Sequence, residues 1–442
     1  MFSKLSKFDF IFWTILAIFV IAIGFTLAHR DGRDLKVGLF GVEQVLQKKS
    51  PYDNPSDPNR TIFRYAPGIT ILEYPFLFKA KMVEPSTLGF ENIKPSVFAW
   101  YIFEIIAIFL SAKLIFKIAP SPSKELSRRN LKIGMLLALP LIGYELSNSQ
   151  NKLAALFFLL TAIWLFKKNR WFLSAIAFNI AMTIYIPLSF FVFYFLIKSK
   201  GKYIIHFLLG AIAIFIVMPA LFFGWNFNIY LLKEWYRCSI SPFSAANSYA
   251  SYVDLRVSSQ SLPSAIGRLF VFGKTGNFKY LISPEAVHTI IRIFSGLILL
   301  FSCIGAFCAR KNEKLDGLAI ATFLILALIM PQYCIYYTWA YLFVVYFIVF
   351  NYVSFPAVSL LQKKALIISL AVLFLSICLI GIHFFKHYSF IFWATFILWV
   401  KMVAVMINEA NIFPSQKRRE NVSANYPHTN YFNMFYMYIL KS

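Results

Sequence analysis

Long, unbroken apolar runs separated by short polar loops make up most of the chain. A window of roughly 19 residues, the length that suits a transmembrane helix, finds about twelve candidate spans. Because the runs are continuous and do not alternate with polar residues, they predict helices rather than the strands of a membrane barrel. The candidate spans cover residues 10–27, 96–118, 133–146, 153–166, 171–185, 188–197, 204–223, 286–309, 318–330, 335–353, 365–382 and 388–407.

Two long polar segments interrupt these runs, at residues 28–95 and 225–285. Loops longer than about 15 residues are often functional. We therefore expect an all-α fold, with one polytopic transmembrane helical bundle over residues 1–408. We expect the two long loops to be external and to carry interfacial helices, and residues 409–442 to form a basic cytoplasmic tail.

The composition supports a membrane location. Hydrophobic residues make up 59% of the chain and charged residues 14%, whereas a soluble domain carries about 25% charged residues. So large an apolar excess must partly face lipid, where only spans with internally satisfied backbones are stable. The five cysteines lack the spacing of a disulfide framework or a zinc site, and we expect no metal or other cofactor.

The formal net charge of +24 would suggest a nucleic-acid partner if the protein were soluble. Here the positive-inside rule gives another explanation, because the cationic residues concentrate in alternate short loops. The rule places both termini in the cytoplasm and both long loops outside, and we expect no nucleic-acid partner. The residues of these basic loops are Lys124, Arg128, Arg129, Lys132, Lys167, Lys168, Arg170, Lys198, Lys200, Lys202, Arg310, Lys311, Lys314, Lys363 and Lys364.

The first long loop carries the most informative charged residues. Asp31 and Asp34 lie among arginines directly after the first span, and residues 34–48 fit an amphipathic helix on the membrane surface. A positioned carboxylate can take the proton of an acceptor hydroxyl, and neighbouring cations can compensate a departing lipid phosphate. The alternative is that Asp34 only pairs with Arg30 at a solvated helix start, and the residues by themselves leave both interpretations open.

Short motifs then follow one another in an order that is worth more than any single one. They are Ser50-Pro51-Tyr52, Phe63-Arg64-Tyr65-Ala66-Pro67, Asn148-Ser149-Gln150-Asn151, Ser259-Gln260-Ser261-Leu262 ahead of Arg268, and Met330-Pro331. With the acidic residue after the first span, this order resembles the polytopic GT-C glycosyltransferases, and most closely glycosyltransferase family 87. The resemblance covers residues 10–353.

The resemblance implies transfer of a hexose, typically mannose, from a polyprenyl-phosphate donor to an external glycolipid, glycan or protein, with inversion. It implies that Asp34 is the catalytic carboxylate and that the second long loop helps to line the site. The expected location is the plasma membrane of a bacterium, with the site on the external side. The residues expected to bind substrate are Asp31, Arg33, Arg64, Tyr65, Gln150, Asn151, Arg256, Gln260 and Arg268.

Two other classes of membrane protein stay open at this point. A transporter or flippase usually has helix breaks at matching points of two repeats near the midplane, whereas the polar residues here concentrate in the external loops. The basic residues of the second loop also fit another lipid-glycan enzyme, such as a polymerase or an acyltransferase. Glu104, inside the second span, is a functional candidate because intramembrane carboxylates are costly, or it is a buried partner of another polar group such as Lys401.

Overall fold

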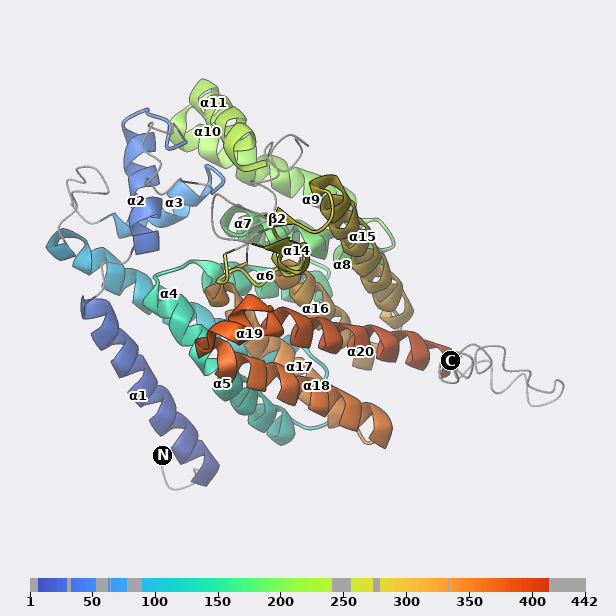
Figure 1. Ribbon diagram of the computed structural model, residues 1–442. Helices are drawn as coiled ribbons and strands as arrows, with labels where there is room; N and C mark the ends of the chain where they lie inside the picture. Colours follow the sequence, from blue (N-terminus) through green and yellow to red (C-terminus); the bar gives the residue numbers. More distant parts are fainter. Residues whose placement is uncertain are drawn as a thin grey trace.

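The computed structural model describes residues 7–29, 33–52, 63, 65–77, 90–240, 256–272, 279–332 and 334–412, and all structural statements refer to these. The chain is almost entirely helical (Figure 1). The helices are α1 (Lys7–His29), α2 (Arg33–Leu46), α3 (Ile69–Glu73), α4 (Phe90–Ile118), α5 (Lys124–Ser147), α6 (Lys152–Lys167), α7 (Trp171–Ile184), α8 (Phe191–Ser199), α9 (Tyr203–Ala211), α10 (Met218–Phe223), α11 (Trp225–Trp235), α14 (Leu262–Phe270), α15 (Pro284–Ala309), α16 (Glu313–Ile329), α17 (Leu342–Val353), α18 (Leu360–Cys378), α19 (His383–His387) and α20 (Phe390–Ile412).

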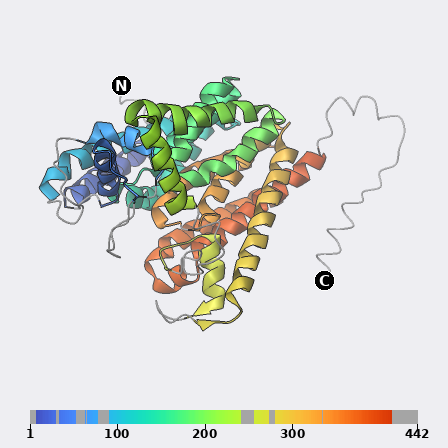
Figure 2. The ribbon, with the colours of Figure 1, turned by 90° about the horizontal axis from the view of Figure 1, so that it is seen from above.

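Short irregular elements join several of these helices. Short 3₁₀ segments form η1 (Tyr74–Phe76), η2 (Ile186–Phe190), η5 (Tyr336–Tyr341) and η6 (Leu379–Gly381), and short π-helical segments form η3 (Ile212–Val217) and η4 (Tyr236–Ile240). Two two-residue strands, β1 (Val271–Phe272) and β2 (Lys279–Tyr280), pair antiparallel after α14. They project from the bundle beside α15 (Figure 2).

Seven helices in the described part of the chain are long and apolar enough to cross a membrane. An eighth is added if α5 and α6 count as one span, because these two helices are bent by 118° at residues 148–151. The chain is therefore an integral membrane protein, but the prediction of about twelve spans is not confirmed. All twelve apolar runs do lie in helical elements, yet α7 and α8 have only 14 and 9 residues, whereas a full span needs about 20.

The core of the bundle is formed by α16 and α17. Every residue of α16 from Leu315 to Ile329 is buried, as is 89% of the apolar window over Tyr336–Val353. A helix that is apolar on all sides belongs in the interior. By contrast, only 11% of the window in α1 is buried, and α1 lies along one edge of the bundle (Figure 1).

The bundle has two ends that differ in polarity, which we call the basic end and the site end. The basic end holds the amino ends of α5 and α16, the carboxyl ends of α6 and α8, and the predicted basic loops. Both ends of the described chain lie there too, because Asp9 pairs with Lys132 and Glu409 accepts a hydrogen bond from Tyr352. The site end holds the turn between α5 and α6, together with α2, α3 and α14.

Candidate functional site

The helix expected in the first long loop is present as α2, and it packs onto the protein. Leu35 and Leu39 are 2% and 0% exposed, and Val42 and Val45 are also buried. The apolar face of α2 is therefore covered by the protein rather than left for lipid, which differs from the expected surface helix. Asp34 lies in the first turn of α2.

Close approach at two glycines explains why α2 packs so tightly. A Cβ added at Gly38 would lie 2.7 Å from Cδ of Glu73, and one added at Gly41 would lie 2.7 Å from Cδ2 of Phe63. Neither distance is tolerated by a real side chain. These two glycines thus bring the helix that carries Asp34 directly against Phe63 and α3.

The sharp turn between α5 and α6 lies beside this loop. The Lys152 amide donates to Glu145 Oε1 over 2.7 Å, and Trp100 Nε1 donates to the Gln150 carbonyl over 2.8 Å. Gln150 and Asn151 are 3% and 4% exposed. The carboxylate of Glu145 therefore closes the amino end of α6, where unpaired amides favour an acceptor.

A buried ammonium group lies at the centre of the site end. Lys152 is 6% exposed, and its Nζ donates to Asn151 Oδ1 over 2.8 Å. It also lies 5.2 Å from the ring of Tyr65 and 5.1 Å from the ring of Tyr185, as in cation–π contacts. The turn predicted at residues 148–151 and the Tyr65 element of the first loop are thereby brought together.

Buried carboxylates surround this ammonium group. Glu73, Glu104 and Glu145 are 2%, 1% and 0% exposed, and each comes from a different helix. Glu104 faces Glu145, the Ala154 amide and Lys152, whereas the Lys401 side chain is exposed. The suggested pairing of Glu104 with Lys401 is therefore wrong, because α4 packs against α6 and makes no comparable contact with α20.

Glu73 is an unusual carboxyl group for a residue of the first long loop. Burial raises its pKa from 4.5 to about 8, against the opposing effects of a hydrogen bond from Asn151 and the charge of Lys152. One of its oxygens, Oε2, accepts no hydrogen bond among the described residues. At neutral pH Glu73 is therefore mainly the neutral acid.

The second long loop is fixed to the site end by two of the predicted residues. Gln260 Nε2 donates to the carbonyls of Val257 and Lys386 over 2.9 and 3.0 Å. Arg268 donates to the carbonyls of Arg256 and Ser259 over 2.8 and 2.7 Å, and also to Ser389 Oγ. Gln260 and Arg268 are 1% and 6% exposed, whereas the Arg256 side chain is exposed.

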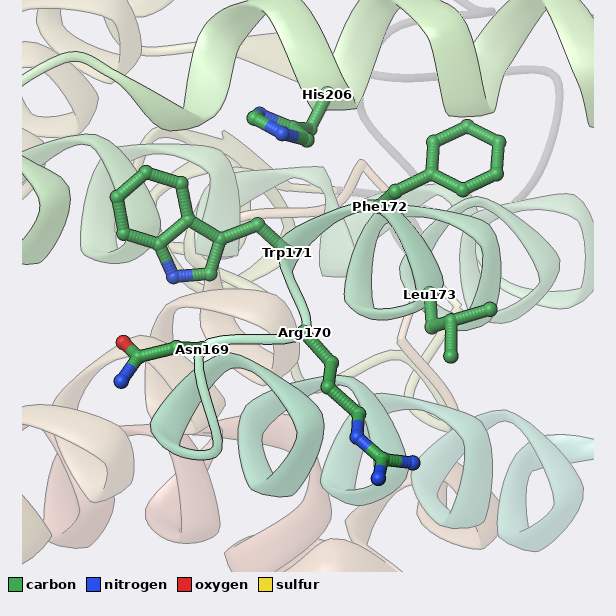
Figure 3. A pocket seen from close by; sticks show the side chains of 6 residues that line it. All are labelled: Asn169, Arg170, Trp171, Phe172, Leu173 and His206. Atoms are coloured by element: carbon green, nitrogen blue, oxygen red, sulfur yellow. The ribbon is translucent and has the colours of Figure 1, made fainter.

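A cavity of about 490 Å³ lies at the opposite, basic end (Figure 3). His206 of α9 and Trp171 of α7 face one another there, with ring centroids 5.6 Å apart, while the Arg170 side chain points away from them. The cavity adjoins the carboxyl end of α6, and the full helix of about 24 Å separates it from the Asn151 turn. It is therefore separate from the candidate site.

Comparison with protein families identifies the chain. The model of glycosyltransferase family 87 matches residues 63–331, more than half of the 442 residues. The chain belongs to glycosyltransferase family 87. No curated protein matches it.

The match confirms the predicted family and establishes this family 87 protein as a glycosyltransferase. It begins at Phe63 and so includes Tyr65, Asn151 and Gln260, but not Asp34. The side chains of Arg33 and Asp34, and the whole of Asp31 and Arg64, lie outside the described residues. Their predicted roles in the glycosyltransferase remain predictions.

Sequence reasoning gave no role to the central ion cluster of this glycosyltransferase. Of the four ionisable residues of this cluster, only Glu104 is a candidate in the sequence analysis. One signal was present for Glu73, because a carboxylate between Ile71-Leu72 and Tyr74-Pro75 has apolar neighbours on both sides. Such a position favours burial.

Proposed function

We propose that this glycosyltransferase moves a hexose, with mannose as the first candidate, from a polyprenyl-phosphate donor to an external glycolipid, glycan or protein. The observation that carries the proposal is the contact of α2 with Glu73 at Gly38. Asp34 precedes Gly38 by four residues, about one helical turn. Its helix is therefore held beside the Asn151 turn and the buried Lys152.

Asp34 acts as the general base in this proposal. The acceptor hydroxyl gives its proton to the Asp34 carboxylate while its oxygen bonds to the anomeric carbon. The bond between that carbon and the phosphate oxygen breaks, and the lipid phosphate leaves with the electron pair. Attack opposite the leaving group inverts the anomeric configuration, and cationic side chains compensate the departing phosphate.

The distribution of charge in the bundle supports a lipid-linked donor. The basic loops and both described chain ends lie at one end, which the positive-inside rule places in the cytoplasm. The site end is then external, in the plasma membrane of a bacterium, where nucleotide sugars are not supplied. In this arrangement residues 1–408 form one domain with external loops at 28–95 and 225–285, and the short helices α7, α8 and α16 belong to the count of about twelve spans.

The substrate contacts divide into two groups. Asp31, Arg33, Arg64, Tyr65 and Arg256 are proposed to contact donor or acceptor directly. The remaining predicted binding residues are deeply buried and engaged in internal hydrogen bonds, so we propose that they shape the site: Gln150, Asn151, Gln260 and Arg268.

The test is transfer by purified protein in lipid nanodiscs. Labelled polyprenyl-phosphate sugars are offered one at a time with glycolipid, oligosaccharide and peptide acceptors, and nucleotide sugars are offered in parallel. We expect product from one lipid-linked donor and none from nucleotide sugars. Direct use of a nucleotide sugar, with no product from any lipid-linked sugar, would refute the proposal.

A further inference from the structure

The carboxyl group of Glu73 lies in a notch on α2 that only glycine provides. Glu73 is the last residue of α3 and is 2% exposed. A Cβ at Gly38 would lie 2.7 Å from both Cδ and Oε1 of Glu73. The carboxyl group therefore rests directly on the backbone of α2, about one turn after Asp34.

The same carboxyl group reaches the transmembrane bundle on its other side. The Asn151 side chain hydrogen-bonds to it, and the charge of Lys152 acts on it from the start of α6. Asn151 is itself held by Lys152 Nζ over 2.8 Å. Glu73 thus connects two parts of the site: the helix that carries Asp34 and the turn between α5 and α6.

Burial disfavours the ionised form of Glu73: desolvation raises its pKa, whereas the hydrogen bond from Asn151 and the charge of Lys152 favour the carboxylate. In the described part of the chain, Lys152 is the cation of the cluster, and Glu104 of α4 and Glu145 of α5 are its other buried carboxyl groups. The charged residues that α2 contributes are Arg33, Asp34, Lys36 and Glu43. A carboxylate at Glu73 would be buried with its Oε2 lacking a hydrogen bond in the described structure, which is the cost that the neutral acid avoids.

We propose that Glu73 is a positioning residue of the transfer site: as the neutral acid it fixes α2, and with it Asp34, against the Asn151 turn, and its ionisation loosens that contact. This inference rests on the proposed function. Glu73 does not act as the base, because a carboxyl group enclosed by α2 and the turn cannot reach an acceptor hydroxyl. Its effect on the reaction passes through the placement of Asp34.

The proposal predicts a loss of activity at alkaline pH. With a pKa of about 8, Glu73 ionises as the pH rises through that value, and Asp34 then loses its fixed position. The free energy of unfolding depends on the same ionisation of Glu73. The folded protein retains it up to about pH 8 whereas the unfolded chain releases it near 4.5, so the stability contributed by the neutral form is lost between these values.

The first experiment compares wild type with Glu73→Gln between pH 6 and pH 9.5. Glutamine keeps the shape and the neutral state, so we expect a wild-type rate at pH 6.5. Above pH 8 the wild-type rate should fall by about tenfold per pH unit, as a single ionisation requires, and Glu73→Gln should keep its rate. Glu285→Gln, which removes an exposed charge at the start of α15, is the matched control and should follow the wild type.

Two results would overturn the proposal. Loss of transfer by Glu73→Gln at every pH would make Glu73 a proton-transferring group, and an alkaline fall identical to that of the wild type would leave it a purely structural residue. Gly38→Ala gives a second approach, because the added methyl group displaces the Glu73 carboxyl group. We expect Gly38→Ala to lower kcat at unchanged donor KM; an unchanged kcat would contradict the positioning role.

A third measurement does not depend on transfer. Thermal unfolding in detergent should show Glu73→Gln gaining stability over the wild type between pH 5.5 and pH 8.5, with no such gain for Glu285→Gln. If no lipid-linked sugar is used by the wild type, the proposed function fails while this measurement still tests Glu73. A constant difference between the two proteins across this pH range would refute the neutral state of Glu73.

Discussion

The two ends of the bundle differ in how far their buried charges are compensated. At the basic end the Asp316 carboxylate lies 2.5 Å from Lys167 Nζ and 2.6 Å from Lys198 Nζ, and Tyr194 donates to it over 3.2 Å. One carboxylate is thus compensated by two cations and one hydroxyl group. At the site end, the described residues set Lys152 against three buried carboxylates, and the Glu104 oxygens accept no hydrogen bond of ordinary geometry.

We interpret the basic-end cluster as structural and the site-end cluster as part of the proposed transfer site. The Asp316 cluster ties α6, α8 and α16 together with its charges compensated, which is the arrangement in which a buried ion pair is tolerated. The site-end cluster holds carboxylates that are costly to bury and incompletely satisfied. Buried carboxyl groups that lack hydrogen-bond partners are concentrated at functional sites. We therefore expect substitutions at the basic end to change stability and substitutions at the site end to change the transfer rate.

Replacing Asp34 should have the largest effect and tests whether the chemistry belongs to the site end. Asp34→Asn removes the proposed base but keeps its size, so we expect initial transfer rates to fall by about 10²–10⁴ with normal thermal unfolding. Asp31→Asn is the matched comparison and should have a milder effect. A greater loss for Asp31→Asn would move the base by about one helical turn.

Replacing Asp316 tests the other side of the comparison. Asp316→Asn leaves Lys167 and Lys198 without their carboxylate, and breaking a buried pair costs about 3–5 kcal/mol. The loss should fall at or below the lower value, because the Lys167 side chain is 31% exposed and can reach water. Thermal unfolding measures the loss, and Glu313→Gln, an exposed neighbour on α16, is the control. Normal melting with abolished transfer would contradict the division of roles.

Replacing Lys152 tests whether this residue stabilises the site-end cluster or contacts the donor. Lys152→Met should destabilise the protein less than Asp316→Asn, because the carboxylates that remain can take up protons. Adding Glu104→Gln should restore part of the lost melting temperature, since it removes one of those carboxylates. A raised donor KM that the double variant does not relieve would instead show that Lys152 contacts the donor phosphate.

The smallest effects should separate the two arginines of the second loop. A charge-assisted hydrogen bond contributes about 1.5–3 kcal/mol, so Arg256→Ala should weaken use of the donor by about ten- to hundredfold. Arg268→Ala should mainly lower the melting temperature, because its guanidinium group holds the Arg256 and Ser259 carbonyls. Donor kinetics and thermal unfolding, measured on both variants, distinguish the two roles. If Arg268→Ala changed only the donor kinetics and left the melting temperature unchanged, Arg268 would be a donor-binding residue.

Much of the fold could be predicted because its signals are local. Each of the twelve apolar runs lies in helical elements, and α2 occupies the segment whose periodicity predicted an amphipathic helix. The number of spans was harder to predict, because hydropathy does not show that α6 turns by 118° from α5 or that α7 ends after 14 residues. Those lengths depend on which neighbours bury each helix.

The candidate site was predictable only in its parts. The order of the motifs indicated the family, which the match over residues 63–331 confirms. The partners of those motifs were not visible: Glu104 faces Glu145 instead of Lys401, and Arg268 holds backbone carbonyls. Residues 104 and 145 lie on different helices, and no spacing along the chain states that these helices meet.

The sequence by itself determined that the protein is a membrane protein, that its basic residues concentrate in alternate short loops, and which family it resembles. These properties depend on stretches of contiguous residues, because the hydropathy of each stretch and the charge of each loop decide how the chain inserts into lipid. The tertiary structure alone decided which buried charges share a cation and that Gly38 receives the Glu73 carboxyl group. Such contacts arise where helices distant in sequence approach within a few ångströms, because burial makes every unpaired charge costly and leaves few arrangements that satisfy it.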